Sequence, residues 1–180
     1  MRVHTLEREQ FIPRPIDEVF RFFSQAENLE EITPPFLKFR ILSVDPPELR
    51  RGTLIKYRLA WHGVIPLRWT TEIVRWDPPY SFADNQLSGP YKLWHHEHCF
   101  DARGSGTQMH DTVRYALPFG IIGDIAHGVA VRRDVEEIFE FRERRIRELF
   151  SAHPPLKGKG AAPLLRRRRR ERTHSSQNRA

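Results

Sequence analysis

Apolar and polar residues alternate over most of the first two-thirds of the chain, and this two-residue period is typical of half-buried β-strands. Short turns containing proline or glycine separate the alternating segments. Neighbouring strands are therefore expected to be antiparallel, because parallel neighbours need long crossover connections. The seven predicted strands cover residues 3–12, 38–44, 53–61, 67–76, 81–87, 93–101 and 106–116.

Three other segments have apolar residues at helical spacing. The first runs from Ile16 to Phe23 and follows Pro15, which fits the first turn of a helix because its missing N–H is not needed there. A second short helix is predicted over residues 26–32, and prolines end it. A long amphipathic helix is predicted over residues 125–150. Its apolar residues are Val131, Val135, Ile138, Phe139, Ile146 and Leu149.

The composition is that of one soluble globular domain, with 180 residues of which 39% are hydrophobic. No segment approaches the roughly 20 apolar residues of a membrane span, and the N-terminus lacks a signal-peptide pattern. We therefore expect a cytoplasmic protein. The single cysteine, Cys99, excludes an internal disulfide and a thiolate zinc cluster.

The net charge of +7 is concentrated at the C-terminal end. Residues 151–180 hold nine basic residues and one acidic residue, whereas residues 1–150 hold 21 basic and 22 acidic residues. Whole-chain charge therefore does not indicate a nucleic-acid-binding domain. We expect residues 154–180 to form a disordered basic tail. Its run from Arg166 to Arg170 can contact an anionic membrane or nucleic acid, or serve only as a solvated extension.

The predicted order is one strand, two short helices, six strands and one long helix. The most distinctive motifs of the chain are Trp69-x-Thr71, Trp76-Asp77-Pro78-Pro79, Phe82-x-Asp84-x-Gln86-x-x-Gly89-Pro90-Tyr91, Trp94-x-His96-x-His98-x-Phe100 and Thr107-x-Met109-x-Asp111-x-Val113-x-Tyr115. Together they resemble the SRPBCC superfamily, which includes START lipid-transfer domains, birch-pollen-allergen-like proteins and polyketide cyclase/dehydrases. The resemblance implies an α+β helix-grip ligand-binding domain over residues 1–153. In that fold, a long C-terminal helix covers the concave face of a seven-stranded curved antiparallel sheet and leaves a cavity between them.

The predicted strand over residues 93–101 has the most unusual composition. Trp94, His96, His98 and Phe100 share one face, so two imidazoles lie between two aromatic rings. In the resembled fold this face lines the cavity, and the alternation in the neighbouring strands adds further residues to the same surface. The expected ligand-binding residues are Trp69, Thr71, Phe82, Asp84, Gln86, Trp94, His96, His98, Phe100, Met109, Asp111 and Tyr115.

Polar groups on this face need partners, because burying them unpaired costs several kcal/mol. They imply a structural hydrogen-bond network, a ligand or water. The resemblance favours binding or carriage of a hydrophobic or aromatic small molecule, such as a lipid, an isoprenoid quinone or a polyketide. The alternative is a polyketide cyclase or dehydratase in which His96, His98 and Asp111 form an acid–base set.

A metal site is a third interpretation of the same residues. The sequence His96-x-His98 plus an acidic residue matches the two-imidazole, one-carboxylate ligand set of non-haem iron and cupin sites. A cupin would also need a later glutamate and histidine at set spacings, and a long terminal helix does not belong to that fold. We therefore expect no metal and no cofactor.

Overall fold

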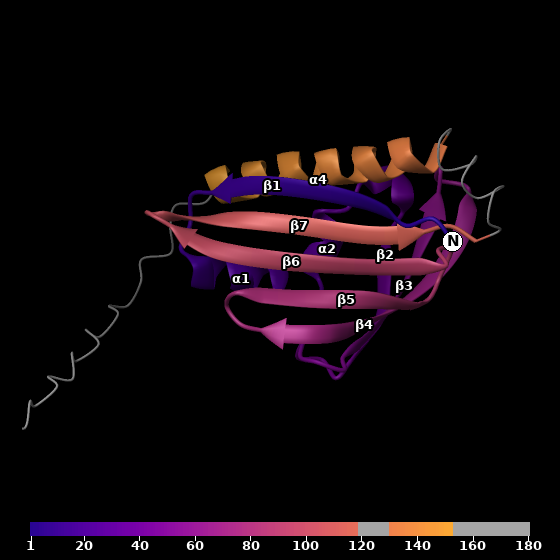
Figure 1. Cartoon of the computed structure of the whole chain (residues 1–180), viewed down its shortest axis with the longest axis horizontal. Helices are drawn as coiled ribbons and strands as arrows, with labels where there is room; N and C mark the ends of the chain where they lie inside the picture. Colours follow the sequence, from indigo (N-terminus) through magenta and orange to yellow (C-terminus); the bar gives the residue numbers. More distant parts are fainter. Residues whose placement is uncertain (119–129, 153–180) are drawn as a thin grey trace, which may run out of the picture.

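The computed structural model describes residues 1–118 and 130–152. The predicted basic tail at 154–180 and the predicted start of the long helix at residue 125 lie outside these ranges. The described elements are shown in Figure 1. They are β1 (His4–Ile12), α1 (Ile16–Phe23), α2 (Asn28–Glu31), η1 (Pro35–Leu37), β2 (Arg40–Asp45), β3 (Leu54–Trp61), β4 (Ile65–Asp77), β5 (Ser81–Ser88), β6 (Leu93–Arg103), β7 (Gly106–Ala116) and α4 (Arg132–Ala152).

The seven strands form one antiparallel sheet in the order β1-β7-β6-β5-β4-β3-β2. Strands that follow one another from β2 to β7 are neighbours, whereas β1 pairs with the last strand. In that pairing His4 lies opposite Tyr115 and Ile12 lies opposite Thr107. The predicted α+β helix-grip fold, with seven antiparallel strands and a C-terminal helix, is confirmed.

Several predicted element boundaries shift for local backbone reasons. Lys38 has a φ of 46° at the end of η1, which is incompatible with extended backbone, so β2 begins only at Arg40. His62 and Gly63 both have positive φ, and the tight turn they form allows pairing to resume at Ile65. Strand β4 is therefore longer than predicted. The second helix is shorter than predicted, spanning only Asn28–Glu31.

Helix α4 packs against one side of the concave face of the sheet. Towards its N-terminal end, Val135 and Phe139 belong to a buried cluster with residues of β1 and β7. Towards its C-terminal end, Ile146 and Phe150 join a second buried cluster with α1 and the β6–β7 pair. Figure 1 shows α4 running alongside β1, which is at the opposite end of the strand order from β2. The part of the concave face formed by β3, β4 and β5 is thus left free to line a cavity.

Candidate functional site

A cavity of about 600 Å³ lies between α4 and strands β3 to β6. Small-molecule sites in proteins typically have volumes of about 300–1,000 Å³. Its wall is largely apolar, so it favours an apolar guest through the hydrophobic effect. Apolar side chains of the wall include Ile55, Leu59, Leu67 and Ile73 from the sheet, Phe23, Ala26 and Leu29 from the α1–α2 region, and Val135, Ile138 and Phe139 from α4.

Aromatic rings cover one part of the wall. The ring of Trp69 packs on Tyr57 at 5.7 Å, on Tyr91 at 5.5 Å and edge-on against Trp94 at 5.3 Å, measured between ring centroids. All four residues line the cavity. The indole nitrogen of Trp69 is buried and has no hydrogen-bond partner within residues 1–118 and 130–152. The aromatic wall therefore offers a guest both stacking surface and one free donor.

The structure places seven of the twelve predicted ligand-binding residues on the cavity wall. The alternation in β6 is as predicted, because His96, His98 and Phe100 are buried while Leu93, His95, Glu97 and Cys99 are only partly buried. The seven wall residues are Trp69, Thr71, Phe82, Asp84, Trp94, His96 and His98.

The other five predicted residues do not line the cavity. Gln86 instead bonds the backbone of Tyr91, with its Nε2 donating to the carbonyl at 2.6 Å and its Oε1 accepting from the amide at 3.3 Å. Phe100 and Met109 are packed in the core against residues of α1 and α4. Tyr115 packs edge-on against Tyr91, and Asp111 lies behind the two histidines.

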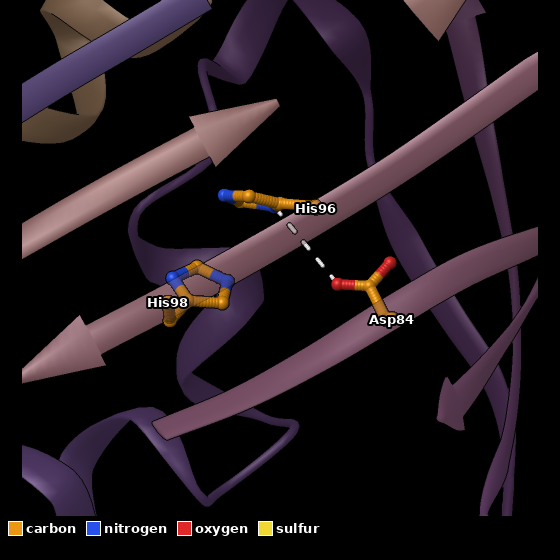
Figure 2. Close-up of side chains that lie close together, drawn as sticks. All are labelled: Asp84, His96 and His98. Carbon is orange, nitrogen blue, oxygen red and sulfur yellow. Dashed lines mark ion pairs between the residues drawn. The ribbon is translucent and has the colours of Figure 1, made fainter. Parts of the chain in front are cut away.

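Asp84, His96 and His98 form a compact polar group on the wall, which we call the β5–β6 cluster (Figure 2). Asp84 and His96 are direct partners in the pairing of β5 with β6. Their closest atoms, Asp84 Oδ2 and His96 Nδ1, are 3.9 Å apart. The two imidazole centroids are also 3.9 Å apart, and both histidines are only 5% exposed. A hydroxyl completes the group, since Thr71 Oγ1 donates to Asp84 Oδ1 at 2.9 Å.

Asp111 of β7 lies behind the β5–β6 cluster. Its Oδ1 is 2.5 Å from Nδ1 of His98 and 3.4 Å from Nε2 of His96. None of these three buried atoms has a well-aligned hydrogen bond within the described residues, so the contacts are close but bent. The group is tightly packed, but its hydrogen-bonding capacity is only partly satisfied.

Burial and neighbouring charge shift the pKa values of this group in different directions. Burial, reinforced by the nearby charge of His98, lowers the pKa of His96 to about 4, although Asp111 and Asp84 act in the opposite sense. Burial alone would raise the pKa of Asp111, but its contacts with His98 and His96 outweigh burial and lower that pKa. His96 is therefore a neutral imidazole and Asp111 a carboxylate near neutral pH.

Arg142 of α4 is a wall residue that the sequence analysis missed. Its guanidinium lies over the Phe139 ring, 4.9 Å from the centroid, and its Nε is buried without a hydrogen-bond partner in the described part of the chain. Burial lowers the pKa of Arg142, while the charges of Asp111 and Asp84 act to raise it. The sequence does contain one indication that Arg142 faces the cavity, because it lies at helical spacing between the apolar residues Phe139 and Ile146.

A polar contact joins the sheet to α4 at a solvent-reaching part of the wall. Trp61 Nε1 donates to Asp134 Oδ2 at 2.7 Å, and His62 Nε2 lies 3.4 Å from the same oxygen. Trp61 and Asp134 both line the cavity and both remain partly exposed. This contact therefore connects the end of β3 with the first turn of α4 on the wall of the cavity.

The model of one protein family, described as "Polyketide cyclase / dehydrase and lipid transport", matches residues 12–140. The match covers most of the chain, so the protein belongs to this family and, with it, to the SRPBCC superfamily. The resemblance noted from the motifs is thus confirmed. No curated protein matches the sequence significantly.

Solved structures with the same architecture come from bacteria and plants. The Zhui aromatase/cyclase from Streptomyces sp. R1128 superposes with a TM-score of 0.67 at 16% identity, covering 83% of this chain and 94% of its own. Protein Ms6760 from Mycobacterium smegmatis has a TM-score of 0.61 at 17% identity, covering 82% and 91%. Major latex-like protein 151 from Panax ginseng also has a TM-score of 0.61, at 14% identity, covering 85% and 99%. At these identities the similarity establishes the fold alone.

The family contains both ligand-binding proteins and polyketide cyclases, so membership does not decide between binding and catalysis. Within residues 1–118 and 130–152, no helix has the length and apolarity needed to cross a lipid bilayer.

Proposed function

We propose that the protein binds and carries a largely apolar, partly aromatic small molecule in the cavity between α4 and the sheet. The observation that carries this proposal is the cavity of about 600 Å³, whose apolar wall contains one buried polar region. A lipid, an isoprenoid quinone or a polyketide would match a wall that is mostly apolar with one polar region. The apolar body of such a guest would replace water along the wall, while the polar side chains of the wall would fix its orientation.

The polar region supports an oxygen-bearing guest rather than a pure hydrocarbon. Arg142 and Trp69 each present a buried N–H without a partner among the described residues. Both groups only donate hydrogen bonds. A carbonyl, quinone or carboxylate oxygen of a guest would satisfy them, and leaving a buried donor unpaired costs about 1–3 kcal/mol.

The test is binding of a fluorescent apolar probe to the full chain, with 1-anilinonaphthalene-8-sulfonate as the probe. Ile138 lines the cavity, so Ile138→Trp fills part of its volume. We expect one probe per chain in the wild type and at least tenfold weaker binding in Ile138→Trp. Leu42→Trp is the matched control because Leu42 is exposed on β2 and does not line the cavity. Equal affinity in all three proteins, with unchanged melting temperatures, would show that the probe binds elsewhere.

A second candidate function is that of a polyketide cyclase or dehydratase. One observation favours it: Asp111 lies 2.5 Å from His98 Nδ1, as expected for a carboxylate that orients a general base, and His98 lines the cavity. Incubation with a poly-β-keto thioester followed by mass spectrometry separates the two functions. A carrier returns the compound unchanged, whereas an enzyme converts it and loses at least about 100-fold in rate on His98→Gln.

Two further predictions from the sequence remain proposals. We place the protein in the cytoplasm, where a carrier would meet freely diffusing guests. We also propose that Arg166 to Arg170 contact an anionic membrane surface, from which an apolar guest could be collected. Comparing liposome and DNA binding of the full chain with that of a variant lacking residues 156–180 tests the second point.

A further inference from the structure

The β5–β6 cluster brings together three atoms of the kinds that bind metal ions in proteins. One oxygen of Asp84 and one ring nitrogen each of His96 and His98 all lie within 4.8 Å of one another. The three side chains come from two adjacent strands whose pairing places Asp84 beside His96. Because paired strands hold their side chains in fixed relative positions, this arrangement is built into the sheet rather than into a loop.

Asp111 contacts each imidazole ring on the side that faces away from Asp84. It contacts Nε2 of His96 at 3.4 Å and Nδ1 of His98 at 2.5 Å. Figure 2 shows the remaining nitrogen of each ring, Nδ1 of His96 and Nε2 of His98, on the side of Asp84. A neutral imidazole that carries its proton on one nitrogen has a lone pair on the other. A carboxylate beside the ring nitrogen that does not bind the ion is the usual support of a histidine metal ligand, and the close contacts of Asp111 lie on that side of each ring.

A carboxylate oxygen of Asp84 and one nitrogen of each imidazole face one another within this cluster. The Thr71 hydroxyl donates to Oδ1 of Asp84 rather than to the Oδ2 atom that faces His96, and the positive charge of Arg142 acts on Asp84 from α4. Both histidines are 5% exposed, so bulk water does not surround their ring nitrogens. A cation placed among these three side chains would be attracted to the Asp84 carboxylate and would find one imidazole nitrogen of each ring within reach.

We propose that Asp84, His96 and His98 form a binding site for one divalent transition-metal ion, with Asp111 as the positioning residue for both imidazoles. Zinc and iron(II) both accept two imidazoles and one carboxylate. Ligand bonds of about 2.0–2.2 Å would place the donor atoms roughly 3.4 Å apart. The 3.9 Å between Asp84 Oδ2 and His96 Nδ1 would need to close by about half an ångström. The remaining pairs of ligand atoms lie within 4.8 Å and would need to close by at most about 1.4 Å.

This proposal reverses the expectation from the sequence, which weighed His96-x-His98 without knowing which acidic residue would lie beside it. All three ligands line the cavity, so the remaining coordination positions of the ion would face the cavity interior. An oxygen of a guest could bind there directly. The metal site does not depend on the identity of the guest, and it can be tested in its absence.

The test uses the full chain, stripped with a chelator and titrated with Co²⁺, whose visible spectrum reports the coordinating atoms. We expect one Co²⁺ per chain, displaced stoichiometrically by Zn²⁺. Asp84→Asn and His98→Gln should each weaken binding by at least about 100-fold, and Asp111→Asn by roughly 10- to 100-fold. The control is His95→Gln, on the same strand but outside the cavity wall and bound to Asn85 at 2.6 Å, which should change the affinity by less than about twofold.

Circular dichroism of each variant checks that the sheet is intact. Asp84 is the least buried ligand, so Asp84→Asn keeps the test valid if a histidine variant does not fold. Absence of Co²⁺ and Zn²⁺ binding to the wild type overturns the proposal. So does binding that persists unchanged in folded Asp84→Asn, because the ion would then be held by other histidines of the chain.

Discussion

Asp111 and His98 face each other directly across the β6–β7 pair, with Oδ1 of the carboxylate 2.5 Å from Nδ1 of the imidazole. The same oxygen lies 3.4 Å from Nε2 of His96, so one carboxylate contacts both buried rings. The pairing register of two neighbouring strands thus fixes the contact, and no loop takes part. The arrangement of His96 and His98 in the β5–β6 cluster therefore depends on correct pairing of β6 with β7.

Removing the negative charge of Asp111 should therefore destabilise the fold. Asp111→Asn keeps the shape of the side chain but leaves two buried imidazoles without their charged partner, so we expect the free energy of unfolding to fall by about 1–3 kcal/mol. Urea denaturation measures the change. His110→Gln, on the neighbouring outward-facing position, should cost less than about 0.5 kcal/mol. If the free energy of unfolding fell equally in the two variants, the buried contact of Asp111 would not stabilise the fold more than an exposed side chain does.

Acid should destabilise the metal-free protein through His96. Its pKa is about 4 in the folded state and about 6.5 in the unfolded chain, so the unfolded state takes up the proton first as the pH falls. The stabilising contribution is thus present above pH 6.5 and is lost between pH 6.5 and pH 4. Asp111, whose pKa is lowered, stays ionised in both states over most of this window and adds its own loss only at lower pH.

The variant His96→Gln isolates this effect from that of other titrating groups. Between pH 7 and pH 5 we expect the wild type to lose about 2 kcal/mol more stability than His96→Gln, because one proton uptake is removed. Urea denaturation in the presence of a chelator at both pH values measures the difference. Parallel losses in both proteins would show that His96 titrates alike in the folded and unfolded states.

Arg142 should select guests that carry an acceptor oxygen. In Arg142→Met, affinity for 2-naphthoic acid should fall at least tenfold, because the guanidinium whose unpaired Nε would bind the carboxylate is gone. Affinity for 2-methylnaphthalene, which has no oxygen, should not fall. Quenching of tryptophan fluorescence measures both, since Trp69 and Trp94 line the cavity. Arg145→Met, which removes an outward contact with Glu31 and Glu148, is the control and should leave both affinities unchanged.

The contact between Trp61 and Asp134 should slow the passage of guests. Asp134→Ala removes the 2.7 Å hydrogen bond that joins β3 to α4, so we expect severalfold faster probe binding and release with a smaller change in affinity. Stopped-flow fluorescence measures the two rates. Arg133→Ala changes the adjacent exposed position and should leave them as in the wild type. Unchanged rates in Asp134→Ala would locate the entry route elsewhere.

The sequence predicted the strands well because a two-residue period is a local property that the sheet preserves. For the same reason it predicted that His96, His98 and Phe100 share a face. The sequence did not predict at which residue of β6 the cavity ends. Phe100 lies on the correct face, but α1 and the end of α4 fill the space above it, and only the packing of distant helices decides that.

The candidate site was predictable only in part, for two physical reasons. Register irregularities occur between β4 and β5, and Gln86, expected to face the cavity, instead bonds the backbone of Tyr91. Arg142 was missed because a guanidinium on a charged helix usually points to solvent, and only the tertiary structure shows its neighbours. Residue types and faces follow from sequence periodicity, whereas pairwise neighbours depend on strand register and helix placement.

The pairing of β1 with β7 has a consequence for how this protein is made. The first strand leaves the ribosome long before its partner exists, since His4 pairs with Tyr115 and Ile12 with Thr107. Until then its apolar residues Leu6 and Ile12 have no sheet to join, and the nascent chain carries an unpaired strand edge. Synthesis therefore passes through a period in which chaperone capture or misassociation competes with closure, and sheet closure must await the last strand.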